Sequence, residues 1–245
     1  MTDEERVWLD VPFAQKDQAK ALGARWDPQA RRWYATRVTM PQLERWAALP
    51  DVPATLPGED RAFGGGLFVD LVPASCWFTN VRSCVDQRDW ERLRRMVIER
   101  AGRRCEACSR GRAPAEGRGL EVHERWLYQE TTAVQVLRRL ICLCTDCHTA
   151  THMGLAGLRG IADKAEAHLA ALNHWSPDQV EEHVGAAFEL FTQRSRTHWQ
   201  LDLRILDAAG VRITRPPAPR QRLTIAGETV WATRDREAHK PWPGE

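Results

Sequence analysis

Cys105-Glu-Ala-Cys108 and Cys144-Thr-Asp-Cys147-His148-Thr-Ala-Thr-His152 open and close the stretch that decides the fold of this chain. Each piece begins with a Cys-x-x-Cys knuckle, and two such knuckles give four thiolates to one tetrahedral zinc ion. They lie farther apart than the knuckles of a simple zinc ribbon, where about 15–20 residues intervene. The segment between them is therefore expected to form a structural element of its own.

The four knuckle cysteines predict a structural zinc site. Thiolate sulfur prefers a borderline-soft ion in tetrahedral geometry, which indicates Zn²⁺. Four protein ligands, Cys105, Cys108, Cys144 and Cys147, leave no position open for a substrate. Zinc binding in small modules contributes about 10 kcal/mol or more to folding. The alternative is a reactive dithiol or redox pair, and two knuckles in tandem favour zinc over it.

Three histidines accompany the knuckles. His148 directly follows the last cysteine and His152 comes one helical turn later, so both imidazoles can share one helix face. His123 lies in the intervening segment, within Leu120-Glu-Val-His123-Glu124-Arg-Trp126. The alternative for His148 and His152 is a packed pair that only supports the zinc fold.

The order of knuckle, histidine-bearing segment and second knuckle running into His-x-x-x-His resembles the HNH (ββα-metal) endonucleases in their four-cysteine zinc form, over about residues 103–160. The resemblance implies an α+β fold with a ββα-metal core, extended by helices. It also implies hydrolysis of phosphodiester bonds in DNA, with His123, His148 and His152 holding a catalytic Mg²⁺ or Mn²⁺. Zn²⁺ remains open as that ion.

The sequence departs from the family at the general base. The base is usually the second histidine of a paired motif, and this chain has Glu124 there, beside His123 as metal ligand. Glutamate at its usual pKa of about 4.3 is a weak base at neutral pH unless burial raises that pKa. In a register shifted by one residue, His123 becomes the base and Val122 falls on a ligand position that it cannot fill. The family's middle asparagine has no counterpart here other than Gln129 or Gln135.

Two other functions therefore stay open beside a nuclease with His123, Glu124 and His148 as its catalytic residues. One is a zinc module that has lost the base and binds nucleic acid or a protein without cleaving it. The other is an enzyme that uses the histidines for different metal chemistry.

Charge is distributed unevenly along the chain. The 245 residues carry a formal net charge of only +2, but arginines outnumber acids between residues 82 and 118. Such a face suits phosphates, although a solvated helix surface is the common meaning of mixed charge. We expect nucleic acid as the partner, DNA rather than RNA, with contacts from Arg94, Arg95, Arg103, Arg104 and Arg125.

Composition and cysteine usage indicate the cellular compartment in which we expect the protein. An apolar content of 43% and a charged content of 28% are ordinary for globular proteins. The seven cysteines include three outside the knuckles, Cys76, Cys84 and Cys142, which do not form a disulfide framework. The start, Met-Thr-Asp-Glu-Glu, lacks signal-peptide features, and no apolar run reaches about 18 residues. We expect a cytoplasmic protein without a membrane partner; the sequence does not fix its oligomeric state.

Residues 7–46 predict a small α/β module of strand, helix ending at Gly23, hairpin and short helix. The phrase Val-Pro-Phe-x-x-Lys-Asp-x-Ala-Lys-x-Leu-Gly-Ala-Arg-Trp-Asp resembles a small uncharacterised domain that is often appended to primase-like and other DNA-processing proteins. Trp26, Trp33 and Tyr34 lie beside arginines and suit base stacking. The alternative is that these aromatics form the core of the module.

The predicted organisation is an N-terminal module (1–49), a linker (50–66), the HNH-like zinc domain (67–160), a helical extension packed on it (161–207) and a linker with a C-terminal tail (208–245). Within these segments we expect strands at 67–72 and 201–205, a helix from Asp86 to Gly102 with its arginines facing outward, a helix capped by Ser176, and a hairpin at 223–231.

Overall fold

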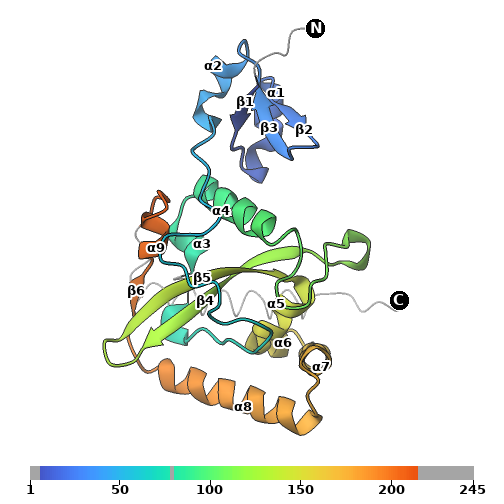
Figure 1. Cartoon of the computed structure of the whole chain (residues 1–245), viewed down its shortest axis with the longest axis vertical. Coiled ribbons are helices and arrows are strands. Elements are labelled where there is room, and N and C mark those ends of the chain that lie inside the picture. Colours follow the sequence, from blue (N-terminus) through green and yellow to red (C-terminus); the bar gives the residue numbers. More distant parts are fainter. Residues whose placement is uncertain (1–5, 78–79, 215–245) are drawn as a thin grey trace.

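The computed structural model describes residues 6–77 and 80–214, and the hairpin expected at 223–231 lies outside these residues. The fold mixes helices with two small three-stranded sheets, which confirms the α+β class. Figure 1 shows the N-terminal module above α4 (Gln87–Arg100), with the second sheet and most helices below it. None of the described helices combines the length and apolar character required to cross a membrane.

The N-terminal module has its own core. Its strands form an antiparallel sheet in the order β1-β3-β2 around buried Leu9, Ala19, Leu43 and Trp46. Gly23 ends the helix at a φ of +94°, as expected, and a Cβ there would lie 2.9 Å from Thr39. The elements of the module are β1 (Val7–Leu9), η1 (Phe13–Gln15), α1 (Lys16–Ala21), β2 (Arg25–Asp27), β3 (Arg32–Ala35), α2 (Met40–Leu43) and η2 (Glu44–Trp46).

A second cluster of buried apolar residues runs from Val52 to Val211. Around it lie η3 (Ala74–Cys76), α3 (Val81–Cys84), α4, η4 (Pro114–Glu116), β4 (Leu120–Gln129), β5 (Val134–Cys144), α5 (Thr145–Thr151), α6 (Met153–Leu158), α7 (Ala162–Asn173), α8 (Pro177–Arg194), β6 (Gln200–Asp202) and α9 (Arg204–Asp207).

A long antiparallel hairpin of β4 and β5 forms the centre of this part, and β6 adds to β5 in parallel. Leu120 pairs with Cys144, so the start of β4 lies beside the second knuckle. Cys144 ends β5 and Cys147 lies in α5, while the first knuckle follows α4. Two strands and a helix thus follow one another directly, and both knuckles meet at one end of the hairpin.

Helix α4 begins where the sequence predicts, because the Asp86 carboxylate accepts a hydrogen bond of 2.8 Å from the Asp89 amide. The expectation that its arginines face outward is wrong for two of them. Arg92 is buried beside Asp89, and Arg100 forms an ion pair of 2.6 Å with Glu59 in which both side chains are almost fully buried. Charged residues enter this core because each finds an opposite charge there.

The segment 50–66 is not the free linker that its composition predicts. Leu56 is fully buried, and Glu59 accepts hydrogen bonds from the amides of Leu56 and Leu140 as well as from Arg100. The strand expected at 67–72 is also wrong, since these residues form no regular element and pair with neither sheet. Their backbone bonds elsewhere: the amide of Asp70 donates to the carbonyl of Thr151 at 3.0 Å.

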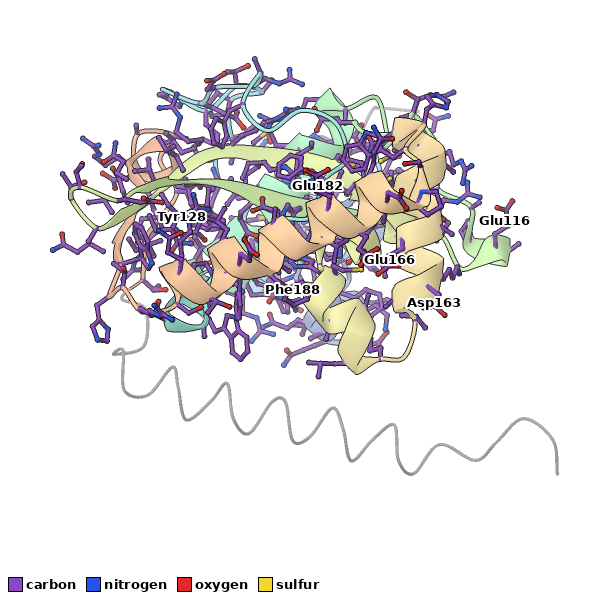
Figure 2. All side chains as sticks on the ribbon, turned by 90° about the horizontal axis from the view of Figure 1, so that it is seen from below. Glu116, Tyr128, Asp163, Glu166, Glu182 and Phe188 are labelled. Carbon is purple, nitrogen blue, oxygen red and sulfur yellow. The ribbon has the colours of Figure 1, made fainter. Side chains whose placement is uncertain are left out.

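The helices after the second knuckle cover the hairpin from the side opposite α4. The capping box predicted at Ser176 and Gln179 is present at the start of α8. Figure 1 shows α8 beneath the hairpin, and Figure 2, seen from below, shows it crossing in front of β4 and β5. The strand expected at 201–205 is shorter, because helix α9 begins at Arg204. Val211, inside the predicted tail, is buried.

Candidate metal centre

The four knuckle cysteines lie together at the end of the hairpin. Their sulfur atoms are all within 4.8 Å of one another, and those of Cys108 and Cys144 are 3.6 Å apart. Four sulfurs at the usual Zn–S distance of about 2.3 Å lie about 3.8 Å from one another. Three of the four residues are buried and Cys108 is half-buried. The donor set and its spacing therefore fit a structural zinc ion, as the sequence predicts.

The protonation of these thiols also fits a cation. Hydrogen bonds from Cys144 and Cys147 hold the pKa of Cys105 far below its ordinary value. The Cys105 sulfur in turn raises the pKa of Cys144 to about 11, and it raises that of Cys147 further. Without a bound cation, only the Cys105 sulfur is therefore ionised, and the neighbouring thiols keep their protons. A divalent cation supplies the charge that allows all four to ionise.

A further histidine contacts the cysteine cluster. The Nε2 atom of His168, on α7, lies 3.2 Å from the Cys147 sulfur. From the sequence, a helical histidine outside any motif is expected to be a surface or core residue, so this contact of His168 was not predicted. Its position lets a ring N–H donate to a thiolate that holds zinc, as residues around metal ligands commonly do.

The three predicted histidine ligands also meet, from two elements. His123 comes from β4, His148 from α5, and His152 from the end of α5, where its amide donates to the His148 carbonyl at 3.1 Å. The ring centroids are 5.5 Å (His123–His148), 4.8 Å (His123–His152) and 4.5 Å (His148–His152) apart. One nitrogen from each ring lies within 4.8 Å of the others, so a single ion can bind all three.

His123 is buried without hydrogen bonds. Its side chain is 2% exposed, and neither ring nitrogen has a hydrogen-bond partner among the described residues. Burial lowers the pKa of His123 to about 4 and that of His152 well below its ordinary value. Both rings are therefore neutral at physiological pH, which is the form that binds metal ions. A buried nitrogen without a partner is costly, and a metal ion would satisfy it.

Two carboxylates lie beside the histidines, and one of them is within hydrogen-bonding distance. Glu121 Oε2 lies 3.1 Å from His148 Nδ1, which leaves Nε2 of that ring as the metal-binding atom. Asp70 Oδ2 lies 3.8 Å from His123 Nε2, beyond hydrogen-bonding distance. Burial alone would raise the pKa of Asp70, but that pKa is lowered, and the Arg125 guanidinium at 3.1 Å is the positive charge that keeps the carboxylate ionised. Carboxylates of this kind orient metal-binding histidines and raise their basicity.

Glu124 follows His123 on the strand and points to the other side of it. Its Oε1 atom accepts a hydrogen bond of 2.9 Å from the Val81 amide at the start of α3, whereas His123 faces α5. Burial raises the pKa of Glu124 above its ordinary value of 4.5.

Arg125, predicted to contact nucleic acid, is fully buried, and that prediction is wrong. Its guanidinium donates to Asp70 at 3.1 Å and to the Gly64 carbonyl at 3.1 Å, and it stacks over Phe68. The neighbouring aromatics, Trp126 and Tyr128, are also buried and so pack the hairpin rather than face a ligand. Arg125 therefore supports the site by pairing with the carboxylate beside His123.

The other four arginines predicted to contact nucleic acid lie at or near the surface. Arg94 and Arg104 are exposed and donate to the carbonyls of Leu120 and Ser109. Arg95 and Arg103 have acidic partners at 2.8 Å, Asp10 and Glu99 respectively. Arg94 and Arg104 thus have the charge available for a phosphate, while Arg95 and Arg103 share theirs with a carboxylate.

The two amides considered in place of the family's asparagine lie far from the histidines. Gln129 ends β4 and Gln135 pairs with Tyr128 across the hairpin. At about 3.4 Å per residue, the five positions from His123 to Tyr128 span about 17 Å. Neither amide takes part in the candidate site.

Sequence reasoning missed Asp70, Glu121 and His168. Glu121 carried a usable signal, because it lies two residues before His123 on one strand and therefore on the same face. Asp70 lies in an irregular segment far from the knuckles, so no local pattern connects it with His123. Its place depends on the path of the whole segment 50–77.

Comparison with known proteins supports only the N-terminal part. No solved structure matches the chain. A curated relative, the DNA primase TraC of Escherichia coli, is 52% identical over 44 residues, which is 18% of this chain and 4% of that protein. A second protein of that name from the same organism is 57% identical over 30 residues, 12% of this chain and 2% of its own length. Residues 6–48 match the family described as "Domain of unknown function (DUF5710)", which confirms the expected small uncharacterised domain.

Proposed function

We propose that this protein is a metal-dependent nuclease of the HNH kind that hydrolyses phosphodiester bonds in DNA. The observation that carries the proposal is the buried His123 ring, which lacks hydrogen bonds and faces His148 and His152. The order of two strands and a helix beside a four-cysteine cluster supports it further. A packed histidine pair that only stabilises the zinc fold would not bring a third, buried imidazole to the same point.

His123, His148 and His152 would hold a divalent ion, Mg²⁺, Mn²⁺ or Zn²⁺. Three protein ligands leave coordination positions free, in contrast to the closed four-cysteine site. Such an ion supplies Lewis-acid chemistry: it neutralises charge on the phosphoryl group and stabilises the leaving oxygen. The position of His123 among the other two rings favours its role as a ligand over the shifted register, in which it would be the base.

The carboxylates around the histidines orient the imidazole rings. Glu121 holds the His148 ring through Nδ1, and Asp70 lies beside His123 while neutralising buried Arg125. These contacts set the ring orientations before substrate binds, which reduces the reorganisation that the reaction requires.

Glu124 is the proposed general base. A base is most effective when its pKa lies near the working pH, and burial moves the pKa of Glu124 upward from 4.5. It would accept a proton from the attacking water, while the Val81 amide holds one carboxyl oxygen in place.

A second candidate function is a zinc module that binds nucleic acid or a protein without cleavage. The observation that favours it is the same Glu124–Val81 hydrogen bond, because a carboxylate fixed by a backbone amide can serve to anchor α3 alone. In that case the histidine cluster remains but no group activates water.

Nicking of supercoiled plasmid separates the two functions. Wild type is assayed with Mg²⁺, Mn²⁺ or no divalent ion, beside His148→Ala, Glu124→Gln and the control His198→Ala, which changes an exposed histidine outside the cluster. A nuclease nicks only with metal, loses this activity in His148→Ala, and loses about 10²–10⁴-fold in Glu124→Gln. His198→Ala should behave as wild type.

DNA binding without cleavage under any metal would favour the non-cleaving module. Equal activity in Glu124→Gln and wild type would remove Glu124 from the mechanism while leaving the metal site intact. Equal activity in His148→Ala and wild type would contradict the nuclease proposal itself.

A further inference from the structure

A groove lies between the N-terminal module and α4, with a cavity volume of about 570 Å³. We call it the interdomain groove. Trp26, Arg31 and Trp33 lie on its module side, and Arg94, Arg112 and Leu120 lie on the side of the zinc-binding part. A cavity of this size suits a ligand of drug-like dimensions, such as one or two nucleotides, and is too small to enclose a duplex.

The groove is strongly basic. Its lining includes seven basic side chains against three acidic ones, in a chain whose formal net charge is only +2. Asp10 pairs with Arg32 and Arg95, and Glu99 pairs with Arg103. Among the described residues, Arg31, Arg94 and Arg112 have no acidic side chain within ion-pair distance. Glu91 also lines the groove, and Glu121 lies within electrostatic range of Arg94, but basic groups remain in excess. Three exposed guanidinium groups that line one groove without forming an ion pair indicate an anionic ligand.

Exposed aromatic rings lie in the same groove. Trp26 is 50% exposed and Phe13 is 75% exposed, whereas the module buries Trp46 to make its core. The alternative considered from the sequence, that the aromatics are only core, therefore does not hold for Trp26. Trp26 packs edge-on against Trp33 at 5.5 Å between centroids, which leaves ring surface open for stacking. Aromatic rings beside arginines are the usual platform for unpaired bases.

The two walls of the groove are held at a fixed separation. Arg95 forms an ion pair of 2.8 Å with Asp10 of the module, and Arg88 donates to the carbonyls of Arg45, at 3.0 Å, and Ala47. Arginines of α4 therefore clamp the module, so the groove exists before any ligand binds. A preformed site loses less entropy when it binds.

One end of the groove leads to the histidine cluster. Arg94 donates to the carbonyl of Leu120 at 3.3 Å, and the next residue, Glu121, lies 3.1 Å from His148. A strand whose phosphates follow Arg112 and Arg94 would thus continue toward the candidate metal centre.

We propose that the interdomain groove binds a single-stranded segment of nucleic acid, with bases on Trp26 and Phe13 and phosphates on Arg31, Arg94 and Arg112. The proposal extends the proposed nuclease function by naming how the substrate strand is held. Binding is measured without divalent metal, so the two proposals can fail separately.

The test is fluorescence anisotropy of a labelled oligothymidylate with the zinc-loaded full chain in a buffer without added Mg²⁺ or Mn²⁺, which leaves the structural zinc in place. Trp26→Ala should weaken binding about tenfold, and Trp26→Phe, which keeps a stacking ring, should restore most of it. Arg94→Gln and Arg112→Gln should each weaken binding and lower the slope of log affinity against log salt by about 0.7.

Matched controls lie on α8 or just beyond it, at the opposite end of the molecule from the module (Figure 1). Arg196→Gln removes the same charge just beyond this helix, and Phe188→Ala removes a ring that is 41% exposed and lies on its surface (Figure 2). Both should bind the oligonucleotide as wild type does. All the replaced side chains are exposed, so the variants are expected to fold.

The proposal is overturned if the groove variants bind like wild type, or if the α8 controls lose as much affinity as they do. Stronger competition by a duplex of mixed sequence, insensitive to Trp26→Ala, would overturn the single-strand assignment. Equal competition by polyglutamate at matched charge would show a general anion surface instead.

Discussion

The four-cysteine cluster and the three-histidine cluster share the same hairpin and helix but differ in how they are built. The sulfurs belong to two turns that close on each other, and four ligands complete a tetrahedral site. The imidazoles number three, one of them buried without hydrogen bonds, and carboxylates stand beside two of them. A complete set of four ligands leaves no coordination position for a substrate and so serves to stabilise the fold, whereas three ligands with orienting carboxylates leave positions at which a substrate and water can bind.

The largest effect is expected from opening the cysteine site. Cys147→Ser removes a buried cysteine of the proposed zinc site. Because zinc binding contributes about 10 kcal/mol to the folding free energy of small modules, the part of the chain around the hairpin should lose its cooperative unfolding transition. Zinc content and thermal unfolding by circular dichroism measure this. Cys142→Ala changes a buried cysteine of β5 that lies outside the cluster, and this variant should keep its zinc and unfold cooperatively.

A smaller loss of stability is expected from Asp70→Ala. The change leaves Arg125 buried with its carboxylate partner gone, which typically costs about 3–5 kcal/mol. Urea unfolding measures the difference from wild type. Glu99→Ala, which breaks the exposed pair with Arg103, should leave stability nearly unchanged. Equal effects of the two changes would contradict the stabilising role of the Asp70–Arg125 pair.

The residues just named also show what the sequence was able to predict. Cysteine spacing and the His-x-x-x-His pattern are local, so they predicted both clusters and the closing helix. Glu59 lies in the segment predicted to be a linker and Asp70 in the segment predicted to be a strand, and they reach Arg100 and Arg125 only through tertiary contacts. Arginine is rarely buried, so the buried position of Arg125 has no signal in a single sequence. It follows from the carboxylate that the fold places beside it.

The carboxylate beside His148 should affect the histidine cluster alone. Glu121→Gln weakens the contact that fixes the His148 ring, and losing such a partner usually costs about 10–100-fold in metal affinity. Titration with Mn²⁺ followed by electron paramagnetic resonance measures this affinity. Zinc content should not change. Glu116→Gln, an exposed carboxylate in the neighbouring turn η4, serves as the control, and a similar loss there would argue against the assigned role of Glu121.

The smallest effect, counted per pH unit, is a pH dependence of stability in protein without added Mg²⁺ or Mn²⁺. His123 has a pKa of about 4 in the folded chain, against 6.5 ordinarily. Between these values the unfolded chain takes up a proton that the folded chain does not, so stability falls as pH decreases from about 6.5 to about 4. The slope is at most about 1.4 kcal/mol per pH unit for one histidine. Urea unfolding at several pH values measures it, and His123→Gln should flatten the slope while His198→Gln should not.

Metal content tests the division between the two clusters most directly. Wild type and His148→Ala are equilibrated with Mn²⁺, freed of unbound ions and analysed for zinc and manganese. We expect one zinc and one manganese per wild-type chain, and one zinc alone in His148→Ala. Wild type that holds zinc but no second ion at any Mn²⁺ concentration, or a variant that keeps its manganese, would contradict this expectation.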